Sequence, residues 1–120
     1  MHAANLQNLI AWQWKVYAQA HQDRRNLLIH IVAVPLFAAG AVSLGASLLA
    51  LSWSLAVFGL TAMLVGFVLQ GVGHRYERNA PPPFASPADF FLRIFTEQFV
   101  IFPRFLVSGA WLRSVRARRA

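Results

Sequence analysis

The chain of 120 residues contains no cysteine, and only 12% of its residues are charged. The absence of cysteine excludes disulfides, thiolate metal sites, iron–sulfur clusters and a cysteine nucleophile. Acidic residues are especially scarce, because 4 Asp and Glu stand against 11 Lys and Arg, which gives a formal net charge of +7. Hydrophobic residues make up 58% of the chain, well above the share in soluble domains. Length and composition therefore predict one small membrane domain over residues 1–120.

Several functional motifs are also missing. The sequence has no Ser-His-Asp order, glycine-rich phosphate loop, zincin helix motif or dinucleotide fingerprint. Its basic residues flank apolar runs and form no stripe with interleaved aromatics, so we expect anionic lipid headgroups as partners and no nucleic acid. No basic segment followed by an apolar stretch opens the sequence, so a cleaved signal peptide is not predicted.

Two uncharged runs, 31–51 and 53–70, are each about as long as a bilayer-spanning helix. With so short a joint between them, they predict a hairpin of transmembrane helices over about 27–51 and 53–76. Pro35 lies one turn inside the first run, where a kink is tolerable. The alternative is a long buried helix pair in a soluble bundle. Small residues that would let the two backbones approach closely are Gly40, Ala41, Gly45, Ala46, Gly59, Ala62 and Gly66.

The hairpin brings both of its open ends to one face of the membrane. Every Lys and Arg lies outside the two apolar runs, so the positive-inside rule predicts that this face is cytoplasmic. We expect an integral protein of a bacterial inner membrane with both termini in the cytoplasm.

The flanking segments complete an all-α fold, a small integral membrane helical bundle. Apolar residues at helical spacing predict an amphipathic helix over about 5–20. The stretch NAPPPFASP excludes a helix, and Ser86-Pro87 is typical of the start of another, over about 87–113. Arg93, Glu97 and Arg104 share one stripe of that segment. We favour an interfacial or re-entrant helix kinked near Pro103 over a span whose polar stripe faces the bundle interior.

The hairpin also gathers side chains that could bind a metal, namely His21, His30 and His74, with Glu77 on the same helix face as His74. His21 and His30 are nine residues apart and would point to opposite sides of one straight helix, so a shared site requires a bend between them. Imidazole and carboxylate ligands suit iron(II), zinc or manganese. Asn26 shares a face with His30.

Two other interpretations remain open for these residues. The protein could be non-enzymatic and bind lipid or a partner, with its histidines as interfacial polar groups. It could also be a haem-binding electron carrier that uses His30 and His74 as axial ligands. Gln70 ends the second run, where a polar group is expected to be functional or hydrogen-bonded across helices. His2, near the N-terminus, is assigned no role.

Two blocks of the sequence resemble the membrane 2-hydroxy fatty acid dioxygenase family of fatty acid α-oxidation, formerly a domain of unknown function. The resemblance covers roughly residues 21–81. In this chain the pattern reads Tyr17-xxx-His21-xxxx-Asn26-xxx-His30-xxxx-Pro35, then Gln70-xx-Gly73-His74-xx-Glu77-xxx-Pro81.

The resemblance implies an Fe(II)-dependent enzyme that uses O₂ to shorten a 2-hydroxy fatty acid by one carbon. It places the iron on His21, His30 and His74, with Asn26 and Glu77 orienting or completing the site. Ala33 departs from the family, which usually has glycine there, and the C-terminal stretch with Arg93, Glu97 and Pro103 is not aligned with the family. The candidates for holding the carboxylate of the substrate are Arg24, Arg25, Arg75 and Arg78.

Overall fold

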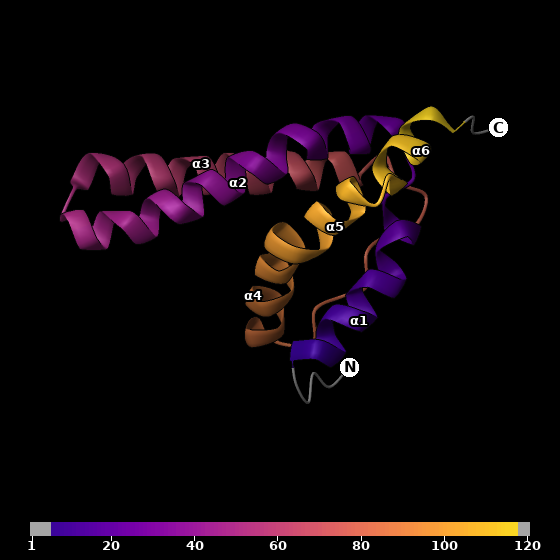
Figure 1. Cartoon of the computed structure of the whole chain (residues 1–120), viewed down its shortest axis with the longest axis horizontal. Helices are drawn as coiled ribbons and strands as arrows, with labels where there is room; N and C mark the ends of the chain where they lie inside the picture. Colours follow the sequence, from indigo (N-terminus) through magenta and orange to yellow (C-terminus); the bar gives the residue numbers. More distant parts are fainter. Residues whose placement is uncertain (1–5, 118–120) are drawn as a thin grey trace.

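The structure is a computed structural model that describes residues 6–117, and within that range it contains helices and no strands (Figure 1). Two long helices form an antiparallel hairpin whose closed end projects to the left, and the shorter helices gather around its open end. The predicted all-helical fold with a central hairpin is confirmed. The helices are α1 (Leu6–Tyr17), α2 (Arg24–Ala50), α3 (Trp53–His74), α4 (Pro87–Thr96), α5 (Phe102–Val107) and α6 (Ala110–Arg116).

Glycines bring the backbones of α2 and α3 into direct contact. A Cβ added at Gly40 would lie 2.6 Å from the carbonyl oxygen of Gly59, and one added at Gly59 would lie 2.7 Å from that of Gly40. A Cβ added at Gly66 would lie 2.8 Å from the carbonyl oxygen of Ala33. Three of the predicted small residues therefore set the helix separation. Gly45 does not, because nothing lies within 4 Å of its added Cβ.

The hairpin closes in a two-residue turn at Leu51 and Ser52. Leu51 ends α2 in the left-handed region, at φ 48°. Ser52 then starts α3 by accepting a hydrogen bond from the backbone N–H of Leu55. The cap at Ser52 satisfies one of the N–H groups that a helix start leaves without a partner.

The closed half of the hairpin exposes large apolar side chains. Leu49 is 91% exposed and Trp53 85%, and Leu64 in the middle of α3 is 63% exposed. Both α2 and α3 are long and apolar enough to cross a membrane. A soluble bundle would bury these surfaces, so the alternative of a buried helix pair does not fit. The exposure favours association of the hairpin with a membrane.

The chain bends between α1 and α2, as the histidine spacing requires. Helix α1 ends at Tyr17, a 3-10 turn spans Ala18–Ala20, and the backbone of His21 is no longer helical, at φ −138° and ψ 62°. Asp23 caps α2 by accepting a hydrogen bond from the backbone N–H of Arg25. Helix α2 thus begins at Arg24, three residues before the predicted start.

The C-terminal segment is divided where a single helix was expected. A π-helical segment, Glu97–Ile101, separates α4 from α5, and Pro103 lies in the first turn of α5. The main break falls later, at Gly109, whose φ of 86° favours glycine. Of the described helices, only α2 and α3 qualify as candidate spans.

The predicted polar stripe of this segment faces α1. Arg93 is buried and donates to the carbonyl oxygens of Pro82 and Pro83, and its guanidinium lies over the ring of Trp12. The guanidinium of Arg104 lies 4.1 Å from the ring centre of Trp14. These contacts join α4 and α5 to α1 beside the open end of the hairpin.

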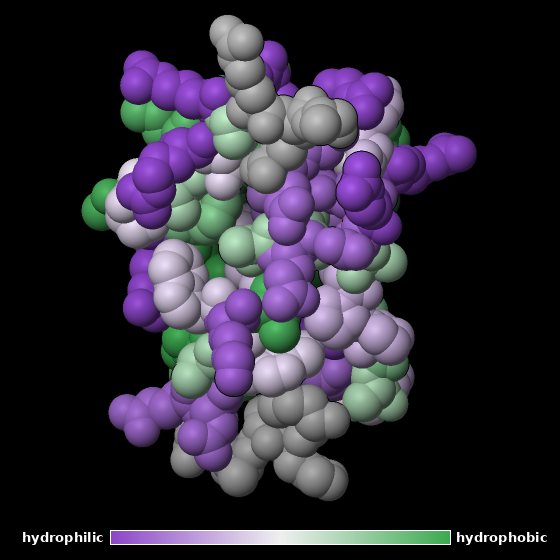
Figure 2. All heavy atoms as spheres, turned by 90° about the vertical axis from the view of Figure 1, so that its right-hand side faces the viewer, coloured by the Kyte–Doolittle hydropathy of each residue, from purple (hydrophilic) through white to green (hydrophobic). Residues whose placement is uncertain are grey.

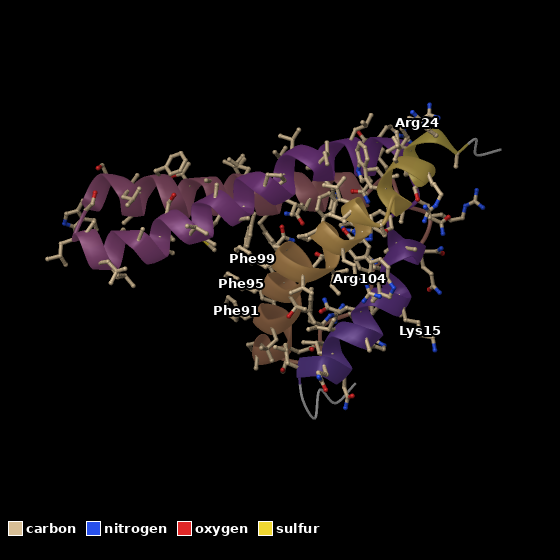
Figure 3. All side chains as sticks on the ribbon, in the orientation of Figure 1. Lys15, Arg24, Phe91, Phe95, Phe99 and Arg104 are labelled. Carbon is tan, nitrogen blue, oxygen red and sulfur yellow. The ribbon has the colours of Figure 1, made fainter. Side chains whose placement is uncertain are left out.

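The opposite side of α4 and of the π-helical segment that follows it is aromatic. Phe91, Phe95 and Phe99 are exposed, and in Figure 3 they point toward the side on which the hairpin projects. Lys15 and Arg24 lie on the other side of the molecule in the same view. That side, seen face-on in Figure 2, is mostly hydrophilic. The helices around the open end therefore separate an apolar side from a polar one.

Candidate metal centre

His21 is positioned by the end of the first helix. Its ring stacks on the ring of Tyr17, with the ring centres 3.6 Å apart, and its Nδ1 lies 2.7 Å from the carbonyl oxygen of Tyr17. A carbonyl oxygen only accepts, so Nδ1 carries the proton and Nε2 keeps its lone pair. This Nε2 is buried and has no hydrogen-bond partner.

His30 has the same arrangement one helix later. Its Nδ1 lies 3.0 Å from the carbonyl oxygen of Asn26, and its buried Nε2 has no partner. Hydrogen bonds from Nδ1 to a backbone carbonyl are the usual way in which proteins orient metal-binding imidazoles. Burial and tautomer therefore prepare the Nε2 of His30 to bind a metal.

His74 joins the pair from the end of α3. Candidate ligand atoms of His21, His30 and His74 lie within 4.8 Å of one another, and the ring centres are 4.6–5.0 Å apart. The Nδ1 of His74 is also buried without a partner. Unpartnered buried polar atoms are rare, and three that converge from different parts of the chain fit a shared cation.

The electrostatics of the centre favour neutral imidazole. Burial lowers the pKa of His21 well below its ordinary value, and His30 and His74 lower it further. The neutral form is the one that binds metals. An apolar core adjoins the histidines: the ring of Tyr17 stacks on His21, and the ring of Phe102 lies 6.3 Å from that of His30. Both belong to a buried cluster with Leu27, Val34, Ile101 and Phe105.

The structure supports an orienting role for Glu77. Its carboxylate accepts hydrogen bonds from the backbone N–H groups of Gln22 and Asp23, at 2.9–3.0 Å, and from Nδ2 of Asn26 at 2.7 Å. Glu77 thus holds the bend that presents His21. Its role as a direct participant in the reaction stays a prediction.

We call Glu77 and its hydrogen bonds to Gln22, Asp23 and Asn26 the clamp. Asn26 connects this clamp to α3. Its side chain is fully buried against Gly73, where an added Cβ would clash with Oδ1 of Asn26. The missing side chain at Gly73 lets α3 approach Asn26 closely, and the next residue is His74. Asn26 also supplies the carbonyl that orients His30. Asn26 therefore contributes to the positioning of all three histidines.

The four predicted arginines are exposed. Arg24 donates from Nε to the carbonyl oxygen of Val115, and Arg25 pairs with Asp23 at 3.0 Å. Arg75 and Arg78 are exposed after α3. None of the described contacts of these arginines reaches the imidazoles, so their predicted role in holding the substrate stays a prediction. His2 lies outside the described residues.

Glu97 was missed as a site residue by the sequence analysis. Its Oε1 lies 4.0 Å from Nε2 of His21, and burial raises its pKa to about 7. The sequence did contain a sign of this role, because Glu97 is an acidic residue inside an apolar segment, and burying such a residue is costly unless it has a function.

Gln70 forms the cross-helix hydrogen bond expected of it, a reciprocal amide pair with Gln98 at 2.8 Å.

The geometry argues against a haem between His30 and His74. Their ring centres are only 5.0 Å apart, and the ring of His21 lies within 4.9 Å of both. A porphyrin needs a flat slot between its two axial ligands, and the short distance between these two rings leaves no room for one. The cavity beside His21 has a volume of only about 30 Å³. A single ion fits this site better than a macrocycle.

The Glu77→Gln substitution tests the clamp. Glutamine has one acceptor oxygen in place of two, so the bend loses part of its support, and we expect affinity for Co(II) to fall roughly 10–100-fold with helicity retained. Asn79→Ala, which removes an exposed bond to Gln19 from the same loop, is the control and should change affinity little. An unchanged affinity in Glu77→Gln, measured by titration, would show that the clamp does not position His21.

Comparisons with known proteins extend the assignment beyond the two blocks of sequence. The family described as 2-hydroxy-palmitic acid dioxygenase Mpo1-like matches residues 8–105, which include the C-terminal segment with Glu97. Neither a curated protein nor a solved structure matches the chain. Since the match covers most of the sequence, the chain belongs to the 2-hydroxy-palmitic acid dioxygenase Mpo1-like family.

Proposed function

We propose that this protein is a membrane-embedded, Fe(II)-dependent dioxygenase that shortens 2-hydroxy fatty acids by one carbon. One observation carries the proposal: three imidazole nitrogens without hydrogen-bond partners lie together at the open end of an apolar hairpin. They belong to His21, His30 and His74. Membership of a family named for a 2-hydroxy-palmitic acid dioxygenase supports the substrate class.

The reaction balances with one O₂ for each acid. A 2-hydroxy acid and O₂ give the acid shorter by one carbon, CO₂ and water, with four electrons passing from C1 and C2 to oxygen. Side chains alone do not activate O₂, and bound iron supplies that redox chemistry. The chain contributes three neutral nitrogen ligands, an apolar enclosure and the fixed orientation of His21 and His30.

A position at the lipid–water boundary suits this chemistry. The hairpin crosses the bilayer in this proposal, and Phe91, Phe95 and Phe99 face its apolar interior from the interface (Figure 3). The histidines lie at the open end of the hairpin, since α2 begins shortly before His30 and α3 ends at His74. The side of the molecule that Figure 2 shows is mostly hydrophilic. A fatty acid can then keep its chain in the bilayer while its head reaches the metal.

The basic residues indicate how the protein is oriented in the membrane. By the positive-inside rule the face that carries them is cytoplasmic, which places both termini on the inner side of a bacterial inner membrane. The exposed arginines then attract the carboxylate of the substrate. An arginine can bind a carboxylate through two parallel hydrogen bonds. The four are Arg24, Arg25, Arg75 and Arg78.

Product analysis tests the proposal. The purified protein in lipid nanodiscs is incubated with Fe(II), O₂ and 2-hydroxypalmitate, and we expect pentadecanoate to form in step with O₂ consumption. Palmitate, which lacks the hydroxyl, is the control and should remain unchanged. Iron-loaded protein that leaves 2-hydroxypalmitate intact would contradict this substrate, and protein that binds no metal would favour the non-enzymatic alternative.

A further inference from the structure

Glu97 is the acidic residue whose position the fold does not otherwise explain. Asp23 caps α2 and pairs with Arg25, Glu77 holds the bend, and Asp89 accepts from the backbone N–H of Ala85 and pairs with Arg93. Glu97 is only 18% exposed, and the one hydrogen bond described for its carboxylate is a long one, 3.4 Å from Gln98. A buried carboxylate with so little compensation is costly unless a cation joins it.

The local backbone directs Glu97 toward the histidines. It is the first residue of the π-helical segment Glu97–Ile101, and single π turns within α-helices occur frequently at functional sites. The next residue, Gln98, forms the buried amide pair with Gln70, four residues before His74. This pair fixes the start of the π-helical segment against the helix that supplies one of the imidazoles.

The distance to His21 fits a shared ion. Nitrogen and oxygen ligands bind a divalent ion at about 2.0–2.2 Å, so two ligands of one ion lie at most about 4.4 Å apart. Oε1 of Glu97 and Nε2 of His21 are 4.0 Å apart. Both atoms can therefore reach the same ion without a change of fold.

We propose that Glu97 is a fourth protein ligand, which makes the centre a site of three histidines and one carboxylate. The inference rests on the metal centre of the proposed function. A carboxylate oxygen adds a hard, charged donor, which suits iron(II) or manganese(II) better than imidazole alone. The four side chains would hold the ion, and iron, when bound, would supply the O₂ chemistry that the side chains lack.

Anaerobic titration with Co(II), followed by visible absorption, tests the assignment on the full chain in detergent. We expect the dissociation constant of Glu97→Gln to rise at least about tenfold, with a changed absorption band, because a ligand is lost. Asp89→Asn removes an acid from the same segment, on the side of Arg93, and should stay within about twofold of wild type. Circular dichroism of each variant reports whether its helices are retained.

The outcomes separate this inference from the proposed function. If Glu97→Gln binds Co(II) as tightly as wild type and with the same spectrum, while His21→Ala loses the ion, Glu97 is not a ligand and the three-histidine centre stands. If the wild-type protein itself takes up no Co(II), the metal centre is refuted and the assignment of Glu97 is refuted with it.

Discussion

Replacing His30 with alanine is expected to remove the bound metal and to lower turnover of 2-hydroxypalmitate by on the order of a thousandfold or more, because ligands that act as a unit fail together. His30 has no exposed surface, and its Nδ1 is already committed to the carbonyl of Asn26. Its Nε2 has no hydrogen-bond partner, so we expect this atom to bind the metal and not to stabilise the fold.

Metal content per chain, measured by mass spectrometry of anaerobically purified protein, checks this expectation. The same loss is expected for His21→Ala and His74→Ala, since each supplies one of the three clustered imidazoles. His2→Ala, which removes the remaining histidine of the sequence, serves as the control and should keep its metal. Full metal occupancy in His30→Ala would remove the basis for the site.

Replacing Gly59 with alanine is expected to destabilise the hairpin by about 1–3 kcal/mol, the usual effect of overpacking. The added methyl would lie 2.7 Å from the carbonyl oxygen of Gly40 and 2.7 Å from the backbone nitrogen of Leu44. These obstacles are backbone atoms, so the helices have to separate. The separation also moves His30 relative to His74, and metal affinity should fall with stability.

Gly71→Ala is the matched control in the same helix. Nothing lies within 4 Å of its added Cβ, so the substitution gains helix propensity, up to about 1 kcal/mol, without a clash. The two substitutions have the same chemistry and are expected to have opposite effects on the thermal unfolding midpoint in detergent. Equal midpoints would mean that close backbone contact does not hold α2 and α3 together.

Much of the fold follows from local patterns in the sequence. Two uncharged runs with a joint of a residue or two determine the hairpin, and the hairpin alone brings His30 and His74 to one end. The bend before α2 follows from the nine-residue spacing of His21 and His30, once both are required at one site. These predictions succeed because they depend on segment length and helical period.

The remainder depends on packing between distant segments. The role of Glu77 is set by backbone N–H groups 54 and 55 residues earlier in the chain. Glu97 reaches His21 through a π-helical segment, and no simple spacing rule predicts such a change of register. Its spacing with Arg93 and Arg104 indicated an amphipathic surface, whereas the structure packs this stripe beside α1, with Arg93 buried, Glu97 half-buried and Arg104 exposed.

The most direct test of the account is X-ray absorption spectroscopy at the iron edge of protein loaded anaerobically with Fe(II). We predict one iron per chain in nitrogen and oxygen coordination, with the multiple-scattering signature of three imidazoles, and no bound iron in His74→Ala. A spectrum without imidazole scattering, or one that is unchanged in His74→Ala, would contradict a centre built from His21, His30 and His74.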